Sequence, residues 1–134
     1  MQFRISYTEA EQLISSKSGK ELPMSYGGPH TVRISYKVPL MSSVGLDITV
    51  DRVFGSDIYL SFGGGAGIEF MLRSALSQAQ GRPGGDMLEM MGGNQLRLML
   101  GKNPQTAQLF DRITLEDIMF DEQWVIIDFT PKPF

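Results

Sequence analysis

Apolar and polar residues alternate along several stretches of the chain, and this alternation restricts the fold more than any other feature. The clearest stretch runs from Thr31 to Val38, where every second residue is apolar. Further strands are predicted at residues 1–7, 44–54, 58–62, 96–100, 113–120 and 123–130. A period of two places the apolar side chains on one face of a strand, and a solvated second face is typical of antiparallel sheets. The pattern therefore predicts a bent antiparallel sheet of about six strands.

One main helix is predicted to pack on this sheet. From about residue 66 to 79, apolar residues recur at helical spacing, while Phe70 points into the polar face. Shorter helices are predicted at residues 8–17, 86–91 and 104–110, and a capping box of Thr8 and Glu11 begins the first of them. The intervening residues 20–29 are predicted to be a loop because they are rich in glycine and proline. The expected class is α+β, as a single domain over residues 1–134.

The strand that begins at residue 44 loses its alternation before it ends. Residues 44–50 are regular, but Arg52 then falls in the apolar register and residues 53–54 carry the apolar character. A shift of this kind indicates a β-bulge or the approach to a turn. The following pair, Gly55-Ser56, predicts a two-residue hairpin turn.

The composition indicates a folded domain without a membrane span. Apolar residues make up 42% and charged residues 20% of the chain, which is ordinary for a globular domain. No apolar run approaches the roughly 20 residues that span a bilayer, and no leader is recognisable, so a cytoplasmic location is expected. The net charge of −3 argues against a nucleic-acid partner. The lack of cysteine excludes disulfides and thiol chemistry.

Charge is distributed unevenly between the two ends of the sequence. Residues 1–43 contain five Lys or Arg and three acids, whereas residues 103–134 contain two and six. Opposite charges are favourable across neighbouring strands. The preferred interpretation is therefore that the first and last strands are neighbours, and a polar partner surface is the alternative.

No set of residues with a catalytic or metal-binding pattern is found in the sequence. The Gly63–Gly67 cluster has the layout of an anion-binding loop, but Ile68 and Glu69 stand where a phosphate loop needs lysine and a hydroxyl residue. His30, the one histidine, has no identifiable catalytic partner, and the acidic residues from 111 to 122 lack a calcium-loop spacing. No catalytic residue, metal or cofactor is therefore predicted; a nucleotide-dependent enzyme using the glycine loop is the third alternative.

Methionine enrichment suggests a function instead. Methionine adapts to varied apolar shapes, and Met87, Met90 and Met91 lie between two glycine pairs that would let the segment move as a flap. The predicted binding residues are Phe70, Met71, Met87, Met90, Met91 and Trp124. The leading hypothesis is a non-catalytic binding module for an apolar, lipid-like ligand or an apolar segment of a protein partner. The alternative is an assembly domain that forms a homo-oligomer, and a simple filling of the core by methionine is also open.

Overall fold

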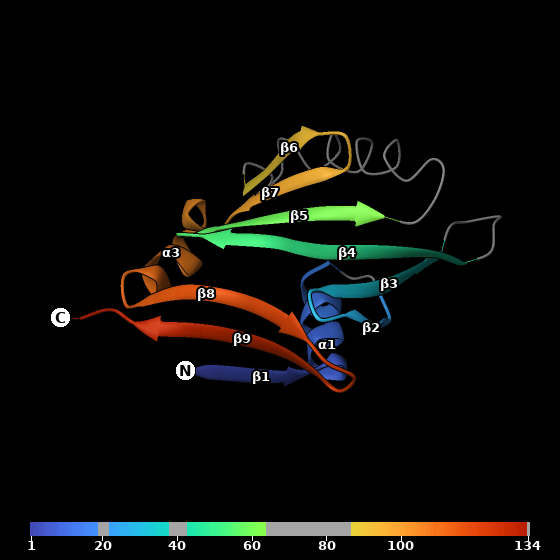
Figure 1. The fold of residues 1–134 in the computed structure, drawn as a ribbon, viewed down its shortest axis with the longest axis horizontal. Helices are drawn as coiled ribbons and strands as arrows, with labels where there is room; N and C mark the ends of the chain where they lie inside the picture. The colour runs from blue at the N-terminus through green and yellow to red at the C-terminus, as the bar shows by residue number, and fades with distance from the viewer. Residues whose placement is uncertain (19–21, 38–42, 64–86, 134) are drawn as a thin grey trace.

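The computed structural model describes residues 1–18, 22–37, 43–63 and 87–133, and within these ranges nine strands form two antiparallel sheets (Figure 1). The smaller sheet has the order β1–β9–β8, with β1 at Gln2–Ser6, β8 at Ile113–Phe120 and β9 at Trp124–Pro131. The larger sheet has the order β2–β3–β4–β5–β7–β6. Its strands are β2 (Met24–Gly28), β3 (Thr31–Lys37), β4 (Ser43–Phe54), β5 (Asp57–Gly63), β6 (Leu88–Gly92) and β7 (Gln95–Met99). The described helices are α1 (Tyr7–Ser18), α3 (Pro104–Phe110) and the single-turn η2 (Leu100–Lys102).

The predicted fold class, one sheet of about six strands packed on a main helix, was wrong. The described residues form a mostly β structure in which a second sheet supplies the opposing apolar layer. The predicted helix at about 66–79 lies outside the described residues, as do Gly64 to Gly67. The alternation identified the apolar strand faces, but the layer that covers them was assigned to the helix at about 66–79, whereas among the described residues β8 and β9 form it.

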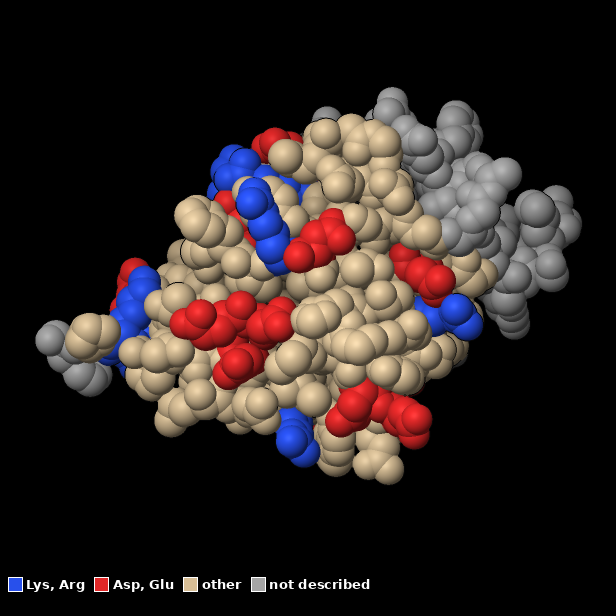
Figure 2. Space-filling model, in the orientation of Figure 1, with Lys and Arg blue, Asp and Glu red and all other residues tan. Residues whose placement is uncertain are grey.

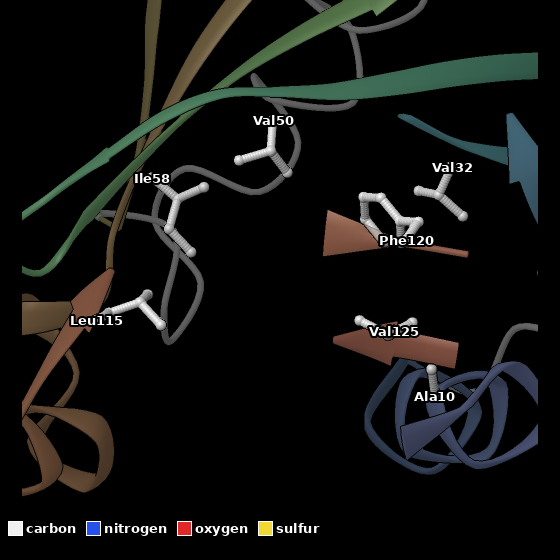
Figure 3. Close-up of a cluster of buried hydrophobic side chains, with 7 residues drawn as sticks. All are labelled: Ala10, Val32, Val50, Ile58, Leu115, Phe120 and Val125. Carbon is white, nitrogen blue, oxygen red and sulfur yellow. The ribbon is translucent and has the colours of Figure 1, made fainter. Parts of the chain in front are cut away.

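The main hydrophobic core lies between the two sheets (Figure 3). Val50 and Ile58 point from the larger sheet toward Leu115 of the smaller one. In the same view Phe120 lies between Val32 and Val125, and Ala10 of α1 closes the end of the stack. A second cluster, around Phe62 and Leu96, includes Leu46, Leu88 and Met90 as partly buried members. The inner face of the larger sheet is therefore apolar along both clusters.

Two strands account for much of the difference between the predicted and observed sheets. Strand β2 occupies part of the predicted loop and pairs with β3, so that Met24 lies opposite Ile34. Strand β6 replaces the helix predicted at residues 86–91 and forms a hairpin with β7. Gly92 and Gly93 have φ angles of 106° and 59° in this turn, a region that glycine enters without steric cost. A segment of five residues is too short for its apolar spacing to distinguish a helix from a strand. Here the pairing with β7 makes the segment a strand.

The N-terminus of α1 is capped two residues earlier than the sequence predicted. The Ser6 hydroxyl accepts a hydrogen bond from the Glu9 amide, and the Glu9 carboxylate accepts one from the Ser6 amide, both at 3.1 Å. These reciprocal bonds are a capping box and lower the pKa of Glu9. Glu11, which was predicted to cap the helix with Thr8, instead accepts a 2.6 Å hydrogen bond from the Met24 amide. It thereby links α1 to β2.

The turn between β2 and β3 connects the two sheets. The carbonyl of Pro29 accepts a hydrogen bond from the Phe120 amide of β8, and the carbonyl of His30 accepts one from the Val50 amide of β4, each at 2.8 Å. The His30 Nε2 atom lies 3.0 Å from Asp117 Oδ2. Separately, β1 pairs with β9, which confirms that the first and last strands are neighbours.

Candidate binding surface on the larger sheet

A bulge in β4 shapes the outer face of the larger sheet. Val50 pairs with Leu60 and Arg52 pairs with Tyr59, so Asp51 is an extra residue in β4. This confirms the bulge indicated by the shifted alternation. Because Val50 and Ile58 belong to the core, Arg52 and Tyr59 lie on the opposite, outer face.

Four side chains form one row across this outer face. Arg52 of β4, Tyr59 of β5, Arg97 of β7 and Glu89 of β6 occupy directly paired positions. The Arg52 guanidinium carbon lies 4.2 Å from the centre of the Tyr59 ring, and that of Arg97 lies 5.9 Å from it. Both distances are within the range of a cation–π interaction. Tyr59 is therefore the centre of the row.

The two arginines of the row differ in their carboxylate partners. Arg97 donates hydrogen bonds to Asp57 Oδ2 from Nε at 3.1 Å and from Nη2 at 2.6 Å, and its Nη1 lies 3.8 Å from Glu89. The hydrogen bonding to Asp57 raises the pKa of the Arg97 guanidinium. Arg52 forms no ion pair with any described residue, although Asp51 precedes it and accepts a hydrogen bond from the Ser61 hydroxyl. The guanidinium hydrogens of Arg52 thus remain available to a partner.

Exposed apolar side chains flank this row beside a hollow. The hollow has a volume of about 300 Å³ and is lined by Asp51, Arg52, Tyr59, Leu60, Met91, Gln95 and Leu96. Met91 is 46% exposed, and Phe54, which pairs with Asp57 two positions beyond Arg52, is 73% exposed. We call the set Arg52, Phe54, Tyr59, Met91 and Arg97 the Tyr59 surface.

The charges over the two sheets are arranged differently (Figure 2). Blue and red side chains lie next to one another over β4, β5 and β7, in the upper part of the view, whereas red side chains gather without blue ones where β8 runs in Figure 1. Pairing positions agree, because Asp117 of β8 lies directly opposite Asp128 of β9. Cation and anion are combined on the larger sheet, and like charges meet on the smaller one.

The structure separates the residues that were predicted to form one binding site. Met91 lines the hollow, but Met90 points to the other side of β6 and packs in the second core cluster. Met87 is half-buried just before β6. Phe70 and Met71 lie outside the described residues. For the described part, the methionine segment is a strand with one inward and one outward methionine, so the helical turns predicted at 86–91 are wrong, while its movement as a flap stays a prediction.

Trp124 lies on the smaller sheet, away from the methionines. It belongs to β9, the central strand of that sheet, whose Val125 and Ile127 face the core. Trp124 and Ile126 alternate with them and belong to neither core cluster, and Met119 lies opposite Ile126. Apolar residues therefore lie on both faces of β9, and only the face that carries Val125 and Ile127 packs in the main core of the described residues.

Sequence reasoning missed Arg52, Phe54, Tyr59 and Arg97 as members of a surface. The available signal was the shifted alternation at Arg52. It indicated that side chains after the bulge point to the opposite sheet faces from those that regular alternation predicts. Tyr59 also alternates with Ile58 and Leu60, which placed it on the face away from the core. The pairing of β5 with β7, which brings Arg97 to Tyr59, joins segments 38 residues apart and has no local signal.

Other kinds of site find less support in the described residues. No group of three or more His, Asp or Glu side chains in them is placed to hold a metal ion, and no helix in these ranges is long and apolar enough to cross a membrane. Comparison of the chain with known protein families, curated proteins and solved structures gave no match.

Proposed function

We propose that the protein is a non-catalytic binding module that holds an apolar segment of a protein partner on the Tyr59 surface. The observation that carries the proposal is the position of two exposed apolar side chains, Phe54 at 73% and Met91 at 46%, on either side of the Arg52–Tyr59 stack, with Met91 also lining the hollow. Burial of these side chains by a partner would remove apolar area from water, which is the main favourable term in association.

The residue types of the surface support a protein partner. Aromatic residues, methionine and arginine are enriched in the cores of protein interfaces, and all three occur together here. The neighbouring Arg97 already has its charge matched by Asp57 and Glu89, so contact with a partner would leave no isolated charge at that position.

The size of the hollow favours a partner side chain over a whole lipid-like molecule. Pockets that enclose small ligands have volumes of roughly 300–1,000 Å³ and bury most of the ligand surface. The hollow, at about 300 Å³, is at the lower limit and includes polar and charged side chains. A single side chain of an extended segment fits these dimensions.

Selection from a random peptide library displayed on phage tests the proposal. We expect the purified protein to select apolar peptides, and the dissociation constants of synthetic copies can be measured by fluorescence anisotropy. The double variant Phe54→Ser with Met91→Ser should weaken binding about tenfold or more, the loss typical of residues at the centre of an interface.

Leu109→Ser provides the matched control because Leu109 is also exposed, at 51%, but lies on α3. It should leave peptide binding unchanged. Failure to select any binding peptide, or equal binding by the wild type and the double variant, would contradict the proposal.

A second candidate function is self-association through the outer face of the smaller sheet. Trp124, Ile126 and Met119 present apolar area on this face outside both core clusters. The face also contains Arg4 opposite Ile126 and the acidic pair Asp117 and Asp128. A two-fold axis brings the same patch of two copies together, and it can place the Arg4 of one copy over the acids of the other.

Sedimentation velocity distinguishes this candidate. We expect a wild-type dimer that Met119→Glu converts to a monomer, whereas the Phe54→Ser and Met91→Ser double variant remains dimeric. A monomeric wild type at the highest attainable concentration would exclude self-association through this face.

A further inference from the structure

The chemistry of the Tyr59 surface defines which apolar side chain it accepts. Resting on the proposed function, we propose that the partner segment presents an aromatic side chain to the hollow and that Arg52 selects it over an aliphatic one.

Arg52 presents one side of its guanidinium to a partner. Its other side lies over the Tyr59 ring, with the guanidinium carbon 4.2 Å from the ring centre. A planar guanidinium can stack on an aromatic ring, and a second ring on the free side would extend the stack. Arg97 donates hydrogen bonds to Asp57, whereas Arg52 forms no ion pair with a described residue. Arg52 therefore offers its charge to the electron-rich face of an incoming ring.

The neighbouring side chains add attraction for the same type of group. Met91 lines the hollow beside Arg52, and a thioether sulfur makes favourable contacts with aromatic rings. Tyr59 also lines the hollow, and aromatic pairs gain more than their buried area alone would give. An aliphatic side chain would receive only the area-dependent part of this attraction.

Asp51 makes an acidic segment a poor occupant. Its carboxylate lines the same hollow next to Arg52, so a carboxylate bound to Arg52 would approach a like charge. An aromatic ring carries no net charge and does not meet this repulsion. Electrostatic complementarity at the hollow therefore favours a ring over both an acid and an aliphatic chain.

Titration of N-acetyl-tryptophanamide and N-acetyl-leucinamide into protein with labelled methionine methyl groups tests the inference by NMR. We expect the tryptophan compound to shift the Met91 methyl resonance at severalfold lower concentration than the leucine compound. Arg52→Gln keeps a polar side chain without the charge and should reduce this preference about three- to fivefold, the range of an exposed cation–π interaction.

Arg33→Gln is the matched control, because Arg33 is an arginine of the same sheet that is paired with Asp47 at 2.8 Å. It should leave the preference unchanged. Equal affinity for the two compounds, or a preference that survives Arg52→Gln, would overturn the aromatic inference and leave the proposed function intact. A lack of any shift at Met91 also overturns the inference, while the proposed function is decided separately by the peptide selection.

Discussion

Each of the two sheets has an aromatic residue on the outer face of an interior strand, but the charges around these two residues differ. Tyr59 of β5 lies between Arg52, which forms no ion pair with a described residue, and Arg97, which is bound to both Asp57 and Glu89. Trp124 of β9 shares its face with Ile126 and with acids that oppose one another. The two faces therefore differ in how charge is arranged: Arg97 is matched by carboxylates on neighbouring strands of its own sheet, whereas Asp117 and Asp128 oppose one another and contact His30 and the terminal amino group.

The largest difference between the two faces should come from removing Asp57. Its side chain is only 17% exposed and holds Arg97 by two hydrogen bonds. Asp57→Ala should lower the free energy of unfolding by about 1–2 kcal/mol, because hydrogen bonds to charged groups contribute roughly this much. Urea denaturation measures the loss.

Asp47→Ala is the control for this variant. Asp47 also binds an arginine of the same sheet, but the pair is exposed at 38% and 56%. Exposed ion pairs contribute little, so stability should stay unchanged within error. Equal losses in the two variants would show that the pair of Asp57 and Arg97 contributes no more to stability than the exposed pair of Asp47 and Arg33.

A smaller effect is expected at the end of the smaller sheet, where Tyr7 donates a 2.5 Å hydrogen bond to the Asp121 carbonyl. Tyr7→Phe should cost about 1 kcal/mol near neutral pH, the typical contribution of one hydrogen bond. Urea denaturation of both proteins over a range of pH values checks it.

The pH dependence of this contribution has a definite sign. Burial, followed by the negative charge of Asp121, raises the pKa of Tyr7. The folded state therefore holds the proton more tightly than the unfolded chain, whose value is about 10. The contribution is complete below that pH and is lost as pH rises through the higher folded pKa. A stability difference that does not shrink at alkaline pH would contradict this assignment.

The smallest expected effect has the opposite sign. Asp128 lies directly opposite Asp117, and its contact with the terminal amino group is exposed and 3.8 Å long. Like charges in opposed positions are destabilising, so Asp128→Asn should raise stability by about 0.3 kcal/mol at low ionic strength. The gain should shrink in salt. A loss of stability would indicate that charge on this face is matched after all.

Much of the strand pattern could be predicted because it depends on local sequence. The alternation from Thr31 to Val38 and the turn at Gly55-Ser56 depend on neighbours in the sequence, and the structure confirms both as β3 and the β4–β5 turn. The α3 helix after Asn103-Pro104 was also predicted correctly. These elements need no knowledge of what packs against them.

The division into two sheets could not be predicted in the same way. Leu115, Val125 and Val50 are all apolar because they face a core. The local sequence does not indicate that residues of two different sheets share that core. The Tyr59 surface could not be predicted for a similar reason. Arg52, Tyr59 and Arg97 come from three strands whose order is set by long-range pairing. The sequence showed only that Arg52 breaks the local pattern.

The β4 bulge has a consequence for how this surface can change over generations. Removal of Asp51 would leave Val50 opposite Leu60 and Arg52 opposite Tyr59 as consecutive pairs of a regular ladder, with the same side chains buried as before. A one-residue deletion there would straighten the strand and withdraw one carboxylate from the hollow without altering the core. The outer surface can therefore be remodelled at a single site of β4 while the register of the buried side chains is kept.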